Sequence, residues 1–223
     1  MSWSDPGPQP RTPRQIAGEL HTLLIKAGIA GPYVLVGHSL GGKNVRLFAL
    51  SHPEEVVGMV LVDARGEYVD ANTTPAEAQG FQQALAAQAF LYRVARSVGL
   101  VRLIGASLWG GPAMPREMRT EGMLLQTSQQ AVDAQTAEGL HRAADDAQLQ
   151  AGPLLGDRPL IVLAAEQNMT VTPYWADAQR QQTALSPSGR LIVVAGSGHS
   201  IHWEQPALVI DAVRQVVKNA RSR

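Results

Sequence analysis

The chain contains four short runs of apolar residues, and each run is followed by a turn and then by a segment with helical spacing. These runs cover residues 33–36, 57–62, 159–165 and 190–195. Apolar runs without polar alternation are typical of strands buried on both faces of a parallel sheet. Because the strands alternate with helices, the sequence predicts an α/β architecture with a parallel sheet and flanking helices.

The helices between these strands have recognisable start and stop signals. Thr12 can cap a helix, Pro13 suits the first helical position and Gly28 suits the end. Thr172 is expected to cap a later helix over residues 173–185. Spacing predicts further helices over residues 42–51 and 206–218.

Residues 65–158 differ from the rest because they are rich in Ala and Gln and contain no strand pattern. We expect an α/β core from residues 1–64 and 159–223 and a helical insertion between them. Gly110, Gly111, Pro112 and Pro115 are expected to break its helices. Several large side chains in the insertion could line an apolar pocket, although helical spacing favours packing for most of them: Phe81, Phe90, Tyr92, Trp109, Met114 and Met118.

Composition excludes several classes of function. Of the 223 residues, 45% are apolar and 17% charged, which predicts a folded chain, and 19 basic residues balance 19 acidic ones. Neither nucleic acid nor a membrane surface is therefore expected as a partner. The absence of cysteine excludes disulfides and thiolate chemistry. No apolar segment resembles a membrane span or a signal peptide, so we expect a cytoplasmic protein that acts on a small molecule without a metal or cofactor.

Gly37-His38-Ser39-Leu40-Gly41 lies between a predicted strand and a predicted helix, and it fits the G-x-S-x-G nucleophile elbow. The two outer glycines are expected because a side chain two positions before or after the serine would clash with the tight turn. The Leu40 amide, at a helix N-terminus, is expected to serve in an oxyanion hole. The elbow predicts that Ser39 is a nucleophile.

A serine nucleophile needs a base and an orienting acid. His199 follows the last predicted strand in a glycine-containing loop, and His202 is the alternative base. Asp63 ends the second strand and is the favoured acid, with Glu166, after the third strand, as its rival. Functional groups gather at the carboxyl ends of parallel strands, which is where all of these residues fall.

The residues predict acyl transfer to water through Ser39, His199 and Asp63, with ester hydrolysis as the expected reaction. The order of strand, glycine-rich turn, helix, strand and Asp63 also occurs in dinucleotide-binding oxidoreductases. However, residues 37–42 do not follow G-x-G-x-x-G, and an NAD(P)-binding enzyme would give His199 no role.

With these residues in place, nearly the whole chain resembles the α/β-hydrolase superfamily. GHSLGG is similar to its nucleophile elbow, and GSGHSIHWEQP is similar to its G-H-x-x-x-x-E-x-P ending, whose spacing selects His199 over His202. The resemblance implies that residues 65–158 are a cap. Many members carry the acid in a G-x-x-D pattern that falls here on Asn168, whereas a subset carries it one strand earlier, at the position of Asp63.

The resemblance also implies that strands are missing before the elbow. Members typically have four further strands there, whereas about thirty residues precede the elbow here, and Trp3–Gly7 resembles the loop after the fourth. We therefore expect an N-terminally truncated hydrolase that lacks a second oxyanion donor and is catalytically weak or inactive. Its first strand would form an exposed sheet edge that could support a homo-oligomer.

Overall fold

The computed structural model describes residues 5–108, 114–152 and 155–223, and it divides into two compact units. One unit contains residues 1–12 and 73–142, and the other contains residues 13–72 and 143–223. The second of these is called the sheet unit below, and its bounds differ from those of the predicted core, since it leaves out residues 1–12. It includes α3 (Glu67–Asn72) and α8 (Asp146–Ala151), which contact each other and belong to the part predicted as an insertion.

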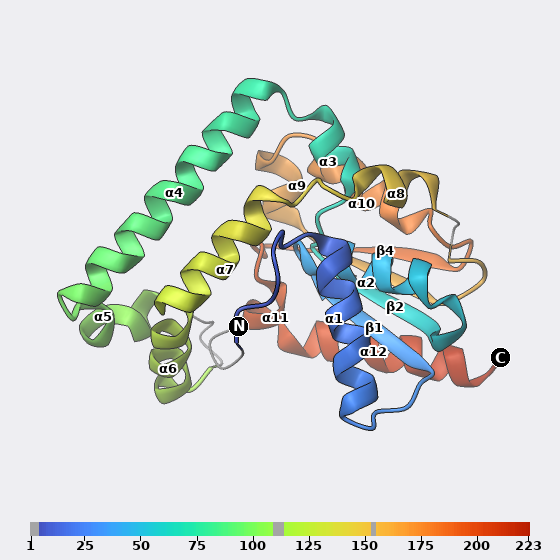
Figure 1. Cartoon of the computed structure of the whole chain (residues 1–223). Helices are drawn as coiled ribbons and strands as arrows, with labels where there is room; N and C mark the ends of the chain where they lie inside the picture. The colour runs from blue at the N-terminus through green and yellow to red at the C-terminus, as the bar shows by residue number, and fades with distance from the viewer. Residues whose placement is uncertain (1–4, 109–113, 153–154) are drawn as a thin grey trace. The chain divides into compact units, whose positions relative to one another are not determined.

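The sheet unit contains four parallel strands in the order β1-β2-β3-β4, which confirms the predicted α/β architecture (Figure 1). The strands are β1 (Tyr33–His38), β2 (Val56–Val62), β3 (Leu160–Ala165) and β4 (Gly189–Val194). The flanking helices are α1 (Pro13–Lys26), α2 (Gly41–Ser51), α9 (Glu166–Val171), α10 (Trp175–Thr183), α11 (Ile201–Glu204) and α12 (Pro206–Arg221). Neighbouring strand ends are paired, so the residues that follow them gather at one edge of the sheet.

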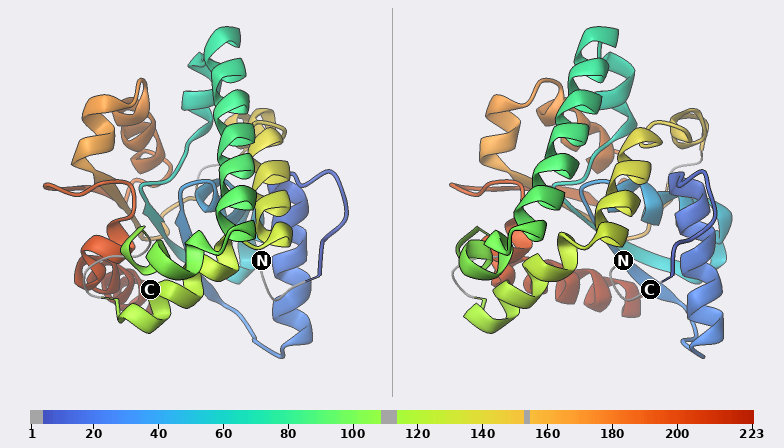
Figure 2. Two further views of the ribbon diagram at one scale, coloured as in Figure 1. Left: turned by 90° about the vertical axis from the view of Figure 1, so that its left-hand side faces the viewer. Right: turned by 60° about the vertical axis from the view of Figure 1, so that its left-hand side comes forward.

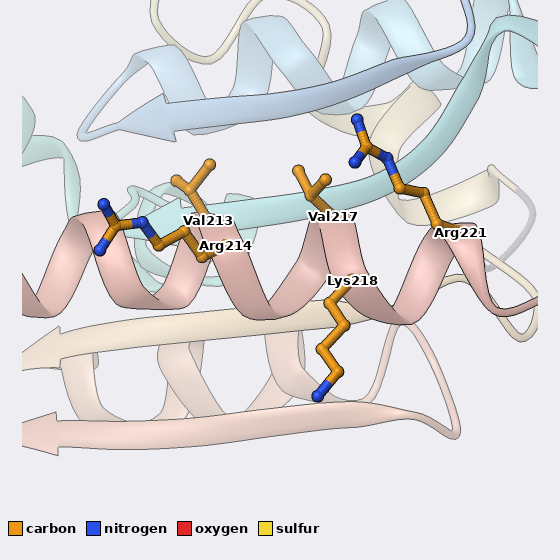
Figure 3. Close-up of a pocket in the computed structure, with 5 residues that line it drawn as sticks. All are labelled: Val213, Arg214, Val217, Lys218 and Arg221. Carbon is orange, nitrogen blue, oxygen red and sulfur yellow. The ribbon is translucent and has the colours of Figure 1, made fainter.

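Strand residues alternate between two buried clusters, one on each face of the sheet. Met59 and Leu61 of β2 pack with residues of α1, α2 and α8, while Val60 and Val62 pack with residues of α11 and α12. Val213 and Val217 extend from α12 to the side of β1 and β2, whereas Lys218 extends to the opposite side, where β3 and β4 lie (Figure 3). The apolar runs in the sequence thus serve two cores at once, which explains why they lack polar alternation.

The two outer strands of the sheet are less buried than the two inner ones. Val36 of β1 is 44% exposed and Val193 of β4 is 46% exposed, because each strand has a neighbour on one side only among the described residues. The expectation that residues 190–195 form a strand buried on both faces is therefore wrong for β4.

The predicted helix over residues 173–185 also differs from the structure. Helix α9 precedes it, and α10 begins at Trp175 behind Tyr174, whose φ is +61°, so Thr172 is not its N-terminal cap. Helix α12 extends to Arg221, three residues beyond the predicted end. Helix α1 ends at Lys26, and Gly28, with a φ of +66°, closes it as expected, since its amide donates to the Ile25 carbonyl oxygen at 3.1 Å.

The other unit is helical, with α4 (Pro75–Ser97), α5 (Leu100–Leu108), α6 (Arg116–Gln126) and α7 (Gln129–Leu140). Helices α4 and α7 lie side by side (Figures 1 and 2), and Leu85 packs so closely on Gly139 that a Cβ there would lie 2.8 Å away. Phe90 and Met118 are 64% and 56% exposed. Trp3, Trp109 and the breaks at residues 110–112 lie outside the described residues, and a role of this unit in forming a pocket stays a prediction. No helix among the described residues has the length and hydropathy needed to cross a membrane.

Candidate active site

Ser39 occupies a sharp turn between β1 and α2 and has a φ of +53°, a left-handed conformation that is unusual for a residue with a side chain. A Cβ on Gly37 would lie 2.7 Å from both the Gly41 carbonyl oxygen and a Val45 methyl carbon, so this position requires glycine. A side chain at Gly41, by contrast, would meet nothing within 4 Å. The expected steric need for the second motif glycine is therefore wrong.

The close approach falls instead on the next glycine. A Cβ on Gly42 would lie 2.4 Å from the Cβ of Ala64, the residue after Asp63. The absence of a side chain at Gly42 thus lets helix α2 approach the loop that follows β2. Two glycines of this stretch are thus required for different contacts. Gly37 allows the turn at Ser39, and Gly42 allows helix α2 to contact Ala64.

Three side chains from separate loops form a continuous hydrogen-bonded chain. His199 Nε2 lies 2.9 Å from Ser39 Oγ, and His199 Nδ1 lies 2.6 Å from Asp63 Oδ2. Because a carboxylate only accepts, Nδ1 carries the proton and Nε2 is left to accept the serine hydroxyl. This is the tautomer that a general base acting on Ser39 requires.

Asp63 is fully buried, and donors surround both of its carboxylate oxygens. The Ala165 amide and Trp175 Nε1 each donate to Oδ1 at 2.9 Å, while His199 Nδ1 and Asn168 Nδ2 both lie 2.6 Å from Oδ2. Such a set of donors compensates for the loss of water around the carboxylate. In a dinucleotide-binding protein a carboxylate at this position would bind the cofactor, and Asp63 does not fit that role because its carboxylate exposes no surface to a ligand.

Asp63 also adopts a left-handed backbone conformation, with a φ of +42°. Among the described residues, the non-glycine positions with positive φ are Ser39, Asp63 and Tyr174. Strained residues persist where the surrounding structure fixes them, and they cluster at functional sites. The same strain thus marks both Ser39 and Asp63.

The rival acid, Glu166, lies elsewhere. Its Oε2 accepts the Gly196 amide at 2.8 Å, and its side chain is exposed. Asn168, the position at which the resemblance placed the usual acid, instead donates to Asp63 and lies 3.1 Å from His199 Nδ1. The structure therefore brings an amide to that position, beside the carboxylate that comes from the neighbouring strand.

Leu40 immediately precedes the helix α2, and its φ of −59° and ψ of −29° already match the helix. The first amides of a helix have no acceptor within that helix, so they are available to an anion. The Leu40 amide therefore has the position expected of an oxyanion donor next to Ser39.

Two further imidazoles lie beside His199. His38 Nε2 donates to the His199 carbonyl oxygen at 2.9 Å, and the His38 ring centroid lies 4.6 Å from that of His199 and 4.4 Å from that of His202. Burial lowers the pKa of His38 to about 4, and burial also lowers the pKa of His202. Near neutral pH, His38 is thus an uncharged donor that holds the loop of His199, while His202 contacts His38 rather than Ser39.

The described residues include one group with the composition of a metal site, formed by His21, His52 and Glu55. The two imidazoles are stacked, with centroids 3.6 Å apart and planes inclined by 16°. A metal ion binds in the plane of each ring, and two parallel planes do not meet at one ion. His21 instead lies within hydrogen-bond distance of Glu55, at 3.2 Å, so the group fits a packing contact.

A hollow of about 400 Å³ lies along α12, and neither Ser39, His199 nor Asp63 lines it (Figure 3). It is lined by Val213, Arg214, Val217, Lys218 and Arg221. Sequence reasoning did not predict three contacts of the site, namely those of Asn168 and Trp175 with Asp63 and that of His38 with the His199 carbonyl oxygen. Only Asn168 had a signal in the sequence, as the amide at the position where related chains carry their acid.

Comparisons with known proteins identify the family and the fold of the chain. The sequence profile of the alpha/beta hydrolase family matches residues 2–212, so the chain belongs to that family. A thermophilic esterase from Thermogutta terrifontis has the same fold, with a TM-score of 0.63 and 22% identity over 98% of this chain and 76% of its own.

Two curated relatives have similar sequences. An uncharacterized protein of Schizosaccharomyces pombe is 29% identical over 90% of this chain, and the 2-(acetamidomethylene)succinate hydrolase of Mesorhizobium japonicum is 26% identical over 91% of this chain and 68% of its own length. The chain spans between 34% and 36% of the length of three curated relatives that it matches, including the S. pombe protein.

Proposed function

We propose that the chain hydrolyses a carboxylic ester or a related acyl compound through an acyl-enzyme on Ser39. The observation that carries this proposal is the unbroken contact from Ser39 Oγ to His199 Nε2, at 2.9 Å, and from His199 Nδ1 to the buried Asp63, at 2.6 Å. Both distances lie within the reach that general-base catalysis by a triad requires.

In the first half of the reaction, His199 Nε2 takes the proton of Ser39 while Oγ bonds to the substrate carbonyl carbon. The carbonyl electrons move onto its oxygen, beside the Leu40 amide. Collapse of this intermediate expels the alcohol, which takes the proton from His199. Asp63 keeps the ring oriented and stabilises the imidazolium that exists between these two proton transfers.

In the second half, water replaces the alcohol. His199 removes a proton from water as the oxygen attacks the acyl carbon, and the proton then passes to Ser39 Oγ when the carboxylic acid leaves. The strained turn at Ser39, with its φ of +53°, supports this role because such an elbow exposes the serine hydroxyl above the sheet. The bond changes balance without an added oxidant or reductant.

The choice of an ester as substrate rests on the reactivity of such a triad and on the proteins to which the chain is similar. A serine activated by a neutral imidazole attacks carbonyl carbon readily, and esters have better leaving groups than amides. The similar fold of a named esterase and the similar sequence of a protein named 2-(acetamidomethylene)succinate hydrolase support a small acyl substrate.

Hydrolysis of p-nitrophenyl acetate and butyrate tests the proposal. We expect a burst of one equivalent of p-nitrophenol followed by slower turnover, since acylation and deacylation are separate steps. Ser39→Ala should abolish the burst and lower turnover about 10⁶-fold. Ser51→Ala, which changes an exposed serine at the other end of α2, is the matched control and should leave both unchanged. Equal activity of Ser39→Ala and Ser51→Ala would contradict the proposal.

A further inference from the structure

A buried cation lies one helical turn beyond Ser39. Lys43 belongs to α2 and is fully buried, and its Nζ donates to Asp70 Oδ2, in α3, at 2.6 Å and to Asp146 Oδ1, in α8. Burying an ammonium group is unfavourable unless anions and acceptors surround it. A chain that needed only packing at this point could use an apolar side chain of similar length, so the ionic contacts require an explanation.

Asp70 joins Lys43 to a second cation. Arg65 Nε and Nη2 donate to the two Asp70 oxygens at distances between 2.7 and 3.2 Å, which is a forked contact. Burial alone would raise the pKa of Asp70, but the Arg65 hydrogen bonds and the Lys43 charge outweigh it and hold that pKa far below its ordinary value. Near neutral pH, Asp70 is therefore a charged link between α2 and Arg65.

Arg65 lies two residues after Asp63, in the short segment of residues 63–66 that we call the acid loop. Its backbone amide donates to the carbonyl oxygen of Ser39 at 2.9 Å. The contacts thus form a closed circuit that runs from Ser39 along α2 to Lys43, across Asp70 to Arg65 and back to Ser39. The nucleophile turn and the acid loop are joined both by backbone and by buried charge.

The middle of the acid loop is fixed as well. The Ala64 carbonyl oxygen accepts from Gln179 Nε2 at 2.8 Å and from Gln182 Nε2 at 2.9 Å, and both glutamines are buried in α10. Ala64 Cβ packs against Gly42, where no side chain would fit. Every residue from Asp63 to Arg65 is therefore held by a partner from another element.

We propose that Lys43, Asp70 and Arg65 are positioning residues that hold the acid loop so that Asp63 meets His199. The proposal rests on the function proposed above. Asp63 keeps a strained φ of +42° and a bond of 2.6 Å to His199 Nδ1, and both require a loop that does not relax. The circuit supplies that restraint, because movement of the acid loop would separate Arg65 from the buried Asp70 carboxylate, which Lys43 holds on α2.

Asp70→Asn tests this role, with Glu67→Gln as the matched control. Glu67 also belongs to α3 and pairs with a residue of α2, since its Oε1 and Oε2 accept from Arg46, but this pair does not include the acid loop. Both substitutions remove one negative charge from an ion pair between the same two helices, so both are expected to lower stability. Only Asp70→Asn releases Arg65.

Two readouts separate positioning from stability. The first is the far-downfield proton resonance of a histidine Nδ1–H bonded to a carboxylate, which reports the contact between His199 and Asp63 directly. The second is the rate of Ser39 labelling by a fluorophosphonate, measured where circular dichroism shows both variants folded. We expect Asp70→Asn to shift or broaden the resonance and to slow labelling by about 10²-fold, the effect of a displacement of about 1 Å at a catalytic group. Glu67→Gln should keep the resonance and label within about twofold of the parent chain.

If Asp70→Asn does not fold, Arg65→Lys replaces it, because lysine keeps the charge but loses the forked contact. Equal resonances and equal labelling in the Asp70 or Arg65 variant and in Glu67→Gln would overturn the positioning role while leaving the proposed hydrolase intact. If the parent chain failed to label with the fluorophosphonate, that result would count against the proposed hydrolase activity. The effect of Asp70→Asn on the His199 resonance would then still support or refute the positioning role.

Discussion

Two adjacent glycines give a matched test of how helix α2 contacts the acid loop. We expect Gly42→Ala to be harmful and Gly41→Ala to be tolerated. A Cβ on Gly42 would lie 2.4 Å from Ala64 Cβ, while ordinary contacts begin near 3.4 Å, so the loop must move by about 1 Å. A Cβ on Gly41 would meet nothing within 4 Å. Because both substitutions replace glycine by alanine in one helical turn, they differ mainly in this contact.

The magnitudes follow from these distances. Crowding a packed interior by one methyl group costs about 1–3 kcal/mol, from which the helix preference of alanine recovers up to about 1 kcal/mol. We therefore expect Gly42→Ala to lower the free energy of unfolding by about 1–2 kcal/mol and Gly41→Ala to raise it by about 0.5 kcal/mol. Displacing the acid loop by about 1 Å should also slow labelling of Ser39 by about 10²-fold in Gly42→Ala.

Urea unfolding followed by circular dichroism measures the first effect, and fluorophosphonate labelling of folded protein measures the second. The reasoning would be refuted if the two alanine variants had the same stability and labelling rate, or if Gly41→Ala were the more damaging change. Either result would mean that the approach of Ala64 to Gly42 does not set the position of the acid loop.

Three further outcomes are expected. Asp63→Asn should lower ester turnover about 10⁴-fold, because it leaves His199 in the wrong tautomer. Glu166→Gln should change ester turnover by less than about twofold, and a larger loss in this variant than in Asp63→Asn would identify Glu166 as the acid. Trp175→Phe removes a donor from the buried Asp63 carboxylate and should lower the free energy of urea unfolding by about 2–3 kcal/mol, while an unchanged value would show that the bond adds nothing. The pKa of His38 is lower in the folded protein than in the unfolded chain, so the unfolded chain takes up a proton first as pH falls. The free energy of unfolding should therefore decline by about 2 kcal/mol between pH 6.5 and pH 4. His38→Gln should reduce this decline, and an unchanged pH dependence in the variant would contradict the reasoning.

The sheet could be predicted from the sequence because its strands are recognisable as short apolar runs. The runs at residues 57–62 and 159–165 are apolar on both faces, and each meets a buried cluster on each face of the sheet. The edge strand β4 has the same kind of sequence but keeps Val193 partly exposed. Composition of a strand reports its preference for burial, whereas its place in the sheet depends on neighbours that a local pattern does not contain.

The Ser39 site was predictable where the signal is local. The strand, tight turn and helix around Ser39 lie within one short stretch, and Asp63 and His199 each follow a strand end. The donors of Asp63 were not predictable in this way, since Trp175 lies 112 residues and Asn168 lies 105 residues from it in the chain. The need for glycine at position 42 was equally hidden, because it depends on contact with Ala64 across the fold rather than on the turn.

The central claim is that Ser39 is a nucleophile activated by His199. Its most direct test is mass-spectrometric mapping of the fluorophosphonate adduct on the parent chain and on His199→Gln. We expect one adduct on the peptide that contains Ser39 and a loss of labelling by several orders of magnitude in the variant, because the hydroxyl then has no base. An adduct on a different serine, or undiminished labelling of Ser39 without the imidazole, would contradict the account.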